Sequence, residues 1–193
     1  DAISVRDQNS QDIISRLIGT KVELVCDPVI LYGYENEMRS FSPPMKDYIL
    51  IYAYDKNLNA ASEYEPIKAY AAKQGLRVVS VGFYHKWCKS VNAEPIELLG
   101  WIRNAKLIVT DTFHGAVMSI ICNTPAAVKL RGNQNKLQFL LAEYGLTERI
   151  VSDFSELERV ANQAVDFNAV NSAVQKRRST SMRYLVESLR MCE

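Results

Sequence analysis

Apolar residues in this chain gather in short unbroken runs, and amphipathic stretches separate them. Uninterrupted runs of this length are typical of strands that are buried on both faces. We predict strands at 48–54, 77–82, 106–110 and 126–130. We predict helices at 60–74, 94–104, 113–123 and 134–144, the first closed by Gly75 and the last by Gly145. This alternation of strands and helices predicts a mostly parallel sheet in a Rossmann-like, doubly wound α/β fold.

The two ends of the chain follow a different pattern. A β-prone run at 2–5, cap candidates at 6–10, a helix ending at Gly19 and a strand at 22–25 come first. We expect Asp27-Pro28 to stop both the strand and any helix. Near the other end, 150–151 should add a short last strand. The tail from about Asn171 has apolar side chains on one helical face, namely Met182, Leu185, Val186 and Leu189.

The first strand motif begins at the very start of the sequence, and we expect the chain to consist of four parts. We expect 1–31 to be the end of a preceding N-terminal domain plus a crossover, and 32–47 to be a linker. Residues 48–165 would then form a Rossmann-like C-terminal domain, followed by a C-terminal helix at 166–193.

Composition narrows the class of protein. The chain is 48% hydrophobic and 23% charged, with a net charge of +1, so no global field attracts nucleic acid. Its first twenty residues lack the apolar segment of a signal peptide, and no run approaches the ~20 apolar residues of a membrane span. The cysteines have no metal-binding spacing: Cys26, Cys88, Cys122 and Cys192. We expect a cytoplasmic protein without a bound metal and with at most peripheral membrane contact.

The segment from Asp111 to Val117 carries the strongest candidate chemistry. It leads directly from a predicted strand into a helix, at the sheet edge where open α/β folds bind ligands. Asp111, Thr112 and His114 would meet unpaired N–H groups and a helix dipole that favours anions. Gly115 within a helix costs about 1 kcal/mol relative to alanine, so we expect a ligand or a neighbouring backbone close to it.

The sequence leaves structural alternatives open. Asp111 or Thr112 could be only the N-cap of the helix, a role worth ~1 kcal/mol. His114 could be a satisfied polar residue at a packed helix start.

Other candidates follow two further strands. Phosphate could be bound by a cluster after the strand at 126–130, although loop charges are often only solvated: Lys129, Arg131, Asn133 and Lys136. Trp87, in the run 83–87, could stack on a sugar or simply pack. The basic run 176–178 could be a solvated helix face or contact an anionic membrane surface.

A family resemblance rests on these segments. The string from Ile108 to Ile120, with Asp111, His114 and Gly115, resembles the signature of the polysaccharide pyruvyl transferase family, Asp-Ser-x-His-Gly after a strand. Three further stretches resemble that family in order and spacing, over residues 1 to about 155: Ser4-Val5-Arg6-Asp7 with Ser10, Val25-Cys26-Asp27-Pro28, and Asn135-Lys136-Leu137 opening a helix that ends Tyr144-Gly145-Leu146. Some members have an arginine where this chain has Thr112.

The resemblance implies a fold and a reaction. The fold is similar to that of two-domain GT-B enzymes, with this chain as the C-terminal half and inactive without an N-terminal half in cis. The reaction moves pyruvyl from phosphoenolpyruvate, the donor substrate, to a sugar as a ketal in cell-surface polysaccharide synthesis, without a cofactor. Alternatives are a GT-B glycosyltransferase that uses a nucleotide sugar, and a non-catalytic binding module, which Thr112 keeps open.

The resemblance also implies roles for individual residues. His114 would transfer the proton, and Asp111 would hold the imidazole or the start of the helix. Arg6 matches an arginine that the family places in the cleft, where it would pair with the donor carboxylate or phosphate. The remaining substrate-binding candidates are Thr112, Gly115, Lys129, Arg131, Asn135 and Lys136.

Overall fold

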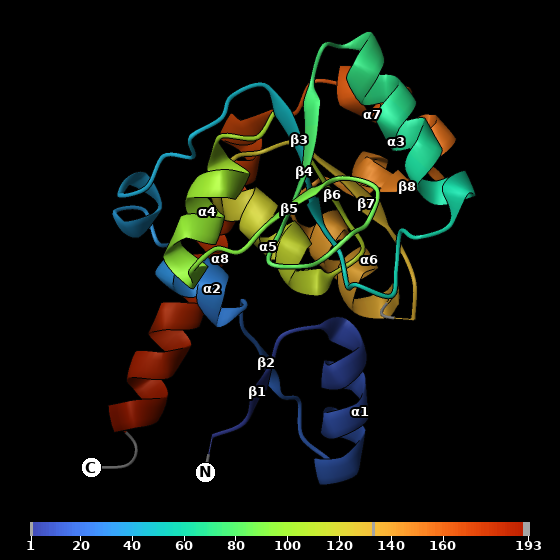
Figure 1. Cartoon of the computed structure of the whole chain (residues 1–193). Coiled ribbons are helices and arrows are strands. Elements are labelled where there is room, and N and C mark those ends of the chain that lie inside the picture. Colours follow the sequence, from blue (N-terminus) through green and yellow to red (C-terminus); the bar gives the residue numbers. More distant parts are fainter. Residues whose placement is uncertain (1, 133, 191–193) are drawn as a thin grey trace.

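The computed structural model describes residues 2–132 and 134–190, so two residues considered above, Asn133 and Cys192, lie outside it. Its centre is a six-stranded, fully parallel sheet with the strand order β5-β4-β3-β6-β7-β8 (Figure 1). The strands are β3 Tyr48–Tyr52, β4 Arg77–Val81, β5 Lys89–Val91, β6 Leu107–Thr110, β7 Ala126–Lys129 and β8 Ile150–Val151. The order reverses between β3 and β6, which confirms the doubly wound α/β architecture.

The unbroken apolar run of β3 reflects two separate cores. Leu50 packs in the core on one face of the sheet, whereas Ile49 and Ile51 pack in the core on the other, and all three are fully buried. Successive side chains of a strand point to opposite faces, so a strand covered on both sides needs apolar residues at every position.

Helices cover both faces (Figure 1). One face carries α3 Ala61–Lys73 and α7 Leu157–Asn162. The other face carries α4 Pro95–Arg103, α5 Phe113–Ile121, α6 Gln134–Glu143 and α8 Phe167–Arg190. Two short 3₁₀ segments, η2 Thr147–Arg149 and η3 Phe154–Glu156, flank β8.

The N-terminal strand–helix–strand unit stands apart from the main sheet. Parallel strands β1 Ser4–Val5 and β2 Glu23–Leu24 flank α1 Gln8–Ile18. Figure 1 shows this unit beneath the end of the main domain where α5 begins. Asp7 caps α1 by accepting a bond of 2.8 Å from the Ser10 amide, and Gly19 ends it with φ 71°. The elements expected in this region are confirmed.

The expectation that Pro28 bars a helix was wrong. Pro28 is the first residue of α2 Pro28–Tyr32, where a missing N–H removes no helical bond. Asp27 caps this helix by accepting a bond of 2.9 Å from the Val29 amide. The expected linker 32–47 contains the 3₁₀ segment η1 Glu37–Arg39, whose Met38 is buried in the same core as Ile30.

Candidate functional site

The turn from β6 into α5 lies at the point where the strand order reverses. Thr112 is the N-cap of α5, and its Oγ1 accepts a bond of 2.9 Å from the Gly115 amide. Thr110 Oγ1 donates to the Tyr52 carbonyl over 2.6 Å and accepts from the Thr112 amide over 3.1 Å. The cap is therefore Thr112 rather than Asp111. The Thr112 side chain, expected to bind substrate, is instead buried and engaged with its own helix.

Gly115 is required by its packing. A Cβ at this position would lie 2.1 Å from Thr110 Oγ1 and 2.8 Å from Thr112 Oγ1. Two threonine hydroxyls occupy the space of a Cβ, a packing reason for this glycine that the sequence did not show. The glycine lets α5 begin immediately after the strand.

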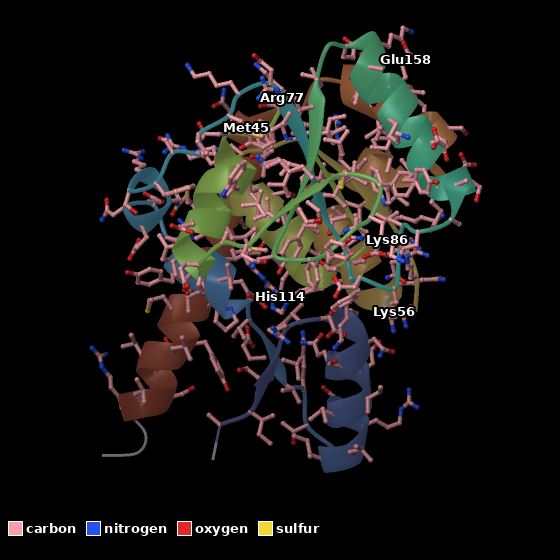
Figure 2. The ribbon with its side chains drawn as sticks, viewed as in Figure 1. Met45, Lys56, Arg77, Lys86, His114 and Glu158 are labelled. Atoms are coloured by element: carbon pink, nitrogen blue, oxygen red, sulfur yellow. The ribbon has the colours of Figure 1, made fainter. Side chains whose placement is uncertain are left out.

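His114, by contrast, is exposed on the first turn of α5. Figure 2 places it on the side of the main domain that faces β1 and β2. Within the described residues, no acceptor is found for the amides of Phe113 and His114. An exposed imidazole thus lies beside two helix N-terminal donors, an arrangement that suits an anion needing proton transfer.

Arg6 reaches this helix start from the N-terminal unit. Its guanidinium carbon lies 5.7 Å from the centroid of the Phe113 ring, which itself meets the His114 ring edge-on at 5.6 Å. Arg6 also pairs with Asp27; 45% of the Arg6 side chain is exposed but only 2% of the Asp27 side chain. Arg6 and His114, far apart in the sequence, therefore both lie against the Phe113 ring at the start of α5.

Asp111 belongs to a different cluster. Its Oδ2 accepts bonds from Asn57 Nδ2 at 2.7 Å and Arg131 Nε at 2.5 Å. Arg131 also binds Glu63 Oε1 at 2.8 Å, and so does Lys129. Two of the predicted phosphate ligands, Lys129 and Arg131, are thus engaged by carboxylates, and the four charges of the cluster sum to zero.

The charges of this cluster affect one another. Burial opposes ionisation of Glu63, but the hydrogen bonds and positive charges of Lys129 and Arg131 outweigh it and lower the pKa of this carboxyl. The cluster ties the loops after β3, β6 and β7 together along the carboxyl edge of the sheet.

Asn135 and Lys136 lie at the start of α6. With Arg131 and with Asn9 of α1 they line a pocket of about 490 Å³ between the N-terminal unit and the main domain. The structure therefore separates Arg6 and His114 at α5 from Asn135 and Lys136 at α6. Lys129 and Arg131 belong to the charged cluster around Asp111, and Arg131 also lines the α6 pocket.

Two residues of this edge, Asn57 and Glu63, were not found from the sequence, and a third, His85, lay within the candidate run 83–87 without a role of its own. His85 is fully buried, with Nδ1 at 2.9 Å from Ser80 Oγ and Nε2 at 3.2 Å from the Asn57 carbonyl oxygen. Burial lowers the pKa of this imidazole. Asn57 and Glu63 follow β3, and no sequence motif marks them.

Trp87 packs within the protein. Its ring stacks on Tyr64, with centroids 5.2 Å apart and the planes inclined by 12°. One face of the indole is therefore covered by packing, and the side chain also lines a pocket at this edge of the sheet.

Residues 2–132 and 134–190 contain neither a metal-binding cluster nor a membrane-spanning helix. No group of three or more His, Cys, Asp and Glu side chains there is arranged to hold a metal ion. No helix in these ranges has both the length and the apolar character needed to span a bilayer.

Comparison with protein families gives the assignment. The model of the family "Polysaccharide pyruvyl transferase" matches residues 1–129. The chain belongs to this family. The polysaccharide pyruvyl transferase match includes Arg6, Asp111 and His114, and it ends before Arg131, Asn135 and Lys136. A sequence comparison with curated proteins finds no match.

Solved structures similar to this polysaccharide pyruvyl transferase family member are enzymes of the GT-B type. UDP-GlcNAc 2-epimerase of Methanocaldococcus jannaschii, in complex with UDP-GlcNAc and UDP, has a TM-score of 0.56 at 15% identity, covering 92% of this chain and 55% of that one. Arabidopsis thaliana UGT89C1, complexed with UDP, has a TM-score of 0.55 at 9% identity, covering 100% of this chain and 59% of that one. The chain thus spans a little over half the length of these neighbours, and the likeness establishes the fold.

Proposed function

We propose that this chain is the C-terminal half of an enzyme that transfers the pyruvyl group of phosphoenolpyruvate to a sugar as a ketal. One observation carries the proposal. The exposed imidazole of His114 lies at the N-terminus of α5 where the strand order reverses, with Arg6 against the adjacent Phe113 ring, and both His114 and Arg6 lie within the family match.

The reaction needs a proton donor at neutral pH. The methylene carbon of phosphoenolpyruvate gains a proton, and positive charge develops at the neighbouring carbon. One sugar hydroxyl adds there, the phosphate leaves, and a second hydroxyl closes the ketal. Of the two hydroxyl protons, one replaces the proton given to the methylene and the other leaves with the phosphate. In our proposal the exposed imidazole of His114 gives the first proton and takes one back from a hydroxyl.

The donor also needs positive partners for its carboxylate and phosphate. In our proposal Arg6 binds one of these anions with the exposed part of its guanidinium while it keeps Asp27. The amides of Phe113 and His114 and the dipole of α5 bind the other. Asn135 and Lys136 line the pocket of about 490 Å³ at α6, where the ammonium group of Lys136 extends the positive surface.

A two-domain enzyme would also explain exposed apolar side chains. Leu17 of α1 is 74% exposed and Leu189 of α8 is 70% exposed. Figure 1 shows the end of α8 extending past the main domain on the side of the N-terminal unit. We propose that an N-terminal domain in cis covers these side chains in a cytoplasmic enzyme of cell-surface polysaccharide synthesis.

A nucleotide-sugar glycosyltransferase is the second candidate. The observation that favours it is that both neighbouring structures were solved with UDP. The N-terminus of α5 would suit a diphosphate as well as a monophosphate. Thr112, in place of the arginine of some family members, favours a third candidate, a non-catalytic binding module.

Calorimetry and turnover on the full-length protein separate these candidates. Pyruvyl transfer requires binding of phosphoenolpyruvate but not of UDP, and release of phosphate that depends on a sugar acceptor. Binding of UDP alone would identify a glycosyltransferase. Binding of phosphoenolpyruvate without turnover on any acceptor tested would identify a binding module.

A further inference from the structure

A second polar pocket lies at the same edge of the sheet, on the side of β4 and α3. Its volume is about 600 Å³, and it forms between the loop after β3 and the loop after β4. Figure 2 shows Lys56 and Lys86, one from each loop, on the same side of the domain. The pocket is lined by Asp55, Asn59, Tyr64, Tyr84, Lys86 and Trp87. None of these residues belongs to the site around His114.

Hydrogen bonds join the two loops to each other. Asp55 Oδ1 accepts a bond of 2.7 Å from the Tyr84 amide, and His85 Nε2 lies 3.2 Å from the Asn57 carbonyl oxygen. The buried His85 is also fixed at its amide, which donates to Ser90 Oγ over 3.1 Å. The pocket is therefore formed before any ligand arrives, and binding costs little loop ordering.

Aromatic rings form its walls. The stacked pair of Trp87 and Tyr64 makes one wall. Tyr84 is 62% exposed, and no aromatic partner for its ring is found in the described part of the chain. A tyrosine ring held on a fixed loop presents an apolar face to a ligand while its hydroxyl stays in water.

The polar groups favour a neutral ligand. Asp55 and Lys86 have opposite charges and balance each other, whereas the α6 pocket holds Arg131 and Lys136. Across residues 2–132 and 134–190 no ion pair of Lys86 is found. A carboxylate, an amide and an ammonium group around an exposed ring suit a molecule with one apolar face and several hydroxyls. A pyranose has this chemistry, and a volume of about 600 Å³ is ample for one or two rings.

We propose that this pocket binds a sugar ring of the acceptor. The ring would stack on Tyr84, donate hydroxyl protons to Asp55 and accept from Lys86. That the sugar is the acceptor rests on the proposed function; the sugar site itself does not. Asn57 links the loops of the pocket to the charged cluster around Asp111, because its carbonyl oxygen meets His85 while its side chain donates to Asp111.

The test is a titration of the full chain, followed by nuclear magnetic resonance. The probes are methyl glycosides of hexoses and N-acetylhexosamines, with UMP and inorganic phosphate for comparison. We expect saturable shifts of the Tyr84 and Lys86 amides and the Trp87 indole N–H with at least one glycoside. Tyr84→Ala and Lys86→Ala should each weaken that binding about three- to tenfold, in line with the energy of one aromatic or polar contact.

Matched controls are Tyr32→Ala and Lys46→Ala, since both residues are exposed and neither lines the pocket. They should leave glycoside binding unchanged. Absence of shifts with every glycoside, equal losses in the control variants, or stronger binding of UMP at the same amides would overturn the sugar site. None of these outcomes depends on phosphoenolpyruvate, so the site is tested separately from the proposed reaction.

The assignment to the acceptor needs the active full-length protein. Tyr84→Ala should raise the KM for the acceptor and leave the KM for the donor unchanged. An unchanged acceptor KM in a variant that has lost glycoside binding would overturn that assignment.

Discussion

Arg131 donates its Nε–H to Asp111 Oδ2 over 2.5 Å and so joins the loop after β7 to the residue that follows β6. The side chain of Asp111 is completely buried, whereas 29% of the Arg131 side chain is exposed. A buried carboxylate needs a partner, because an ion left alone in the interior loses its hydration without compensation. Arg131 therefore positions the loop around the motif, in addition to lining the pocket at α6.

Removal of this partner should destabilise the protein. We expect Arg131→Ala to lower the free energy of unfolding by roughly 1–3 kcal/mol, since Asn57 remains as one partner of Asp111. Urea denaturation measures this change. Lys136→Ala is the control, because Lys136 is exposed and lines the same pocket. Equal midpoints for both variants would contradict a structural role of the Arg131–Asp111 pair.

Glu63 should make stability depend on pH in the acidic range. Its pKa is lowered in the folded protein, so its contribution is fully present above the ordinary value of 4.5 and is lost as pH falls through the folded value. Glu63→Gln should therefore flatten the fall in stability below pH 4.5. Urea midpoints measured across this range test the change. If the urea midpoint falls as steeply with pH in the variant as in the wild type, the ion pairs with Lys129 and Arg131 do not stabilise the ionised Glu63.

Gly115→Ala should disturb the start of α5. The new methyl would meet Thr110 Oγ1 at 2.1 Å, so the cap must shift, and we expect a loss of roughly 1–3 kcal/mol in stability. Gly132→Ala is the matched control, since a Cβ there meets nothing within 4 Å. Thermal unfolding of both variants makes the comparison. If Gly115→Ala is as stable as the wild type, the turn accommodates the methyl group and close packing does not require this glycine.

How much of the fold the sequence predicts depends on burial. The strand β3 was predictable because Ile49, Leu50 and Ile51 supply two cores at once. The strand β5 was not, since Lys89 and Ser90 lie at the sheet edge and carry no apolar pattern. The prediction for Pro28 was wrong because proline breaks a helix only in its interior, whereas at the first helical position it is favoured.

The site was predictable to the extent that it follows from topology. The rule on strand ends located the turn that holds His114 from a single run of sequence. The partners of Asp111 were not predictable, because Asn57 lies 54 positions away in the chain and its contact depends on how two loops meet. Arg6 came from the family resemblance, since no local pattern connects it with α5.

Arg6→Ala should act mainly on the donor in the full-length protein. Loss of one charge-assisted contact should raise the KM for phosphoenolpyruvate about tenfold, with a smaller effect on kcat. Steady-state kinetics test this, and an Arg16→Ala variant controls for a lost surface charge on the same unit, since Arg16 lies near the end of α1. Loss of kcat with an unchanged donor KM would assign Arg6 to chemistry or to folding through Asp27 instead.

His114 gives the sharpest test of the proposed reaction. If its imidazole transfers the proton, His114→Ala in the full-length protein should lower kcat by ~10²–10⁴-fold, the usual range for general acid–base catalysis. Donor affinity should fall much less, because Arg6 and the amides of α5 remain. His114→Gln should recover little activity, since glutamine fills the space and forms hydrogen bonds but does not titrate near neutral pH. Both variants should fold, because His114 is exposed and its amide, rather than its side chain, belongs to the helix.

The measurement is kcat against pH for the wild type and both variants. If His114→Gln keeps a near-normal kcat from about pH 6 to 8, the range in which histidine titrates, the imidazole is structural. The N-terminus of α5 would then only bind the anion, and the proton would have to come from the other domain.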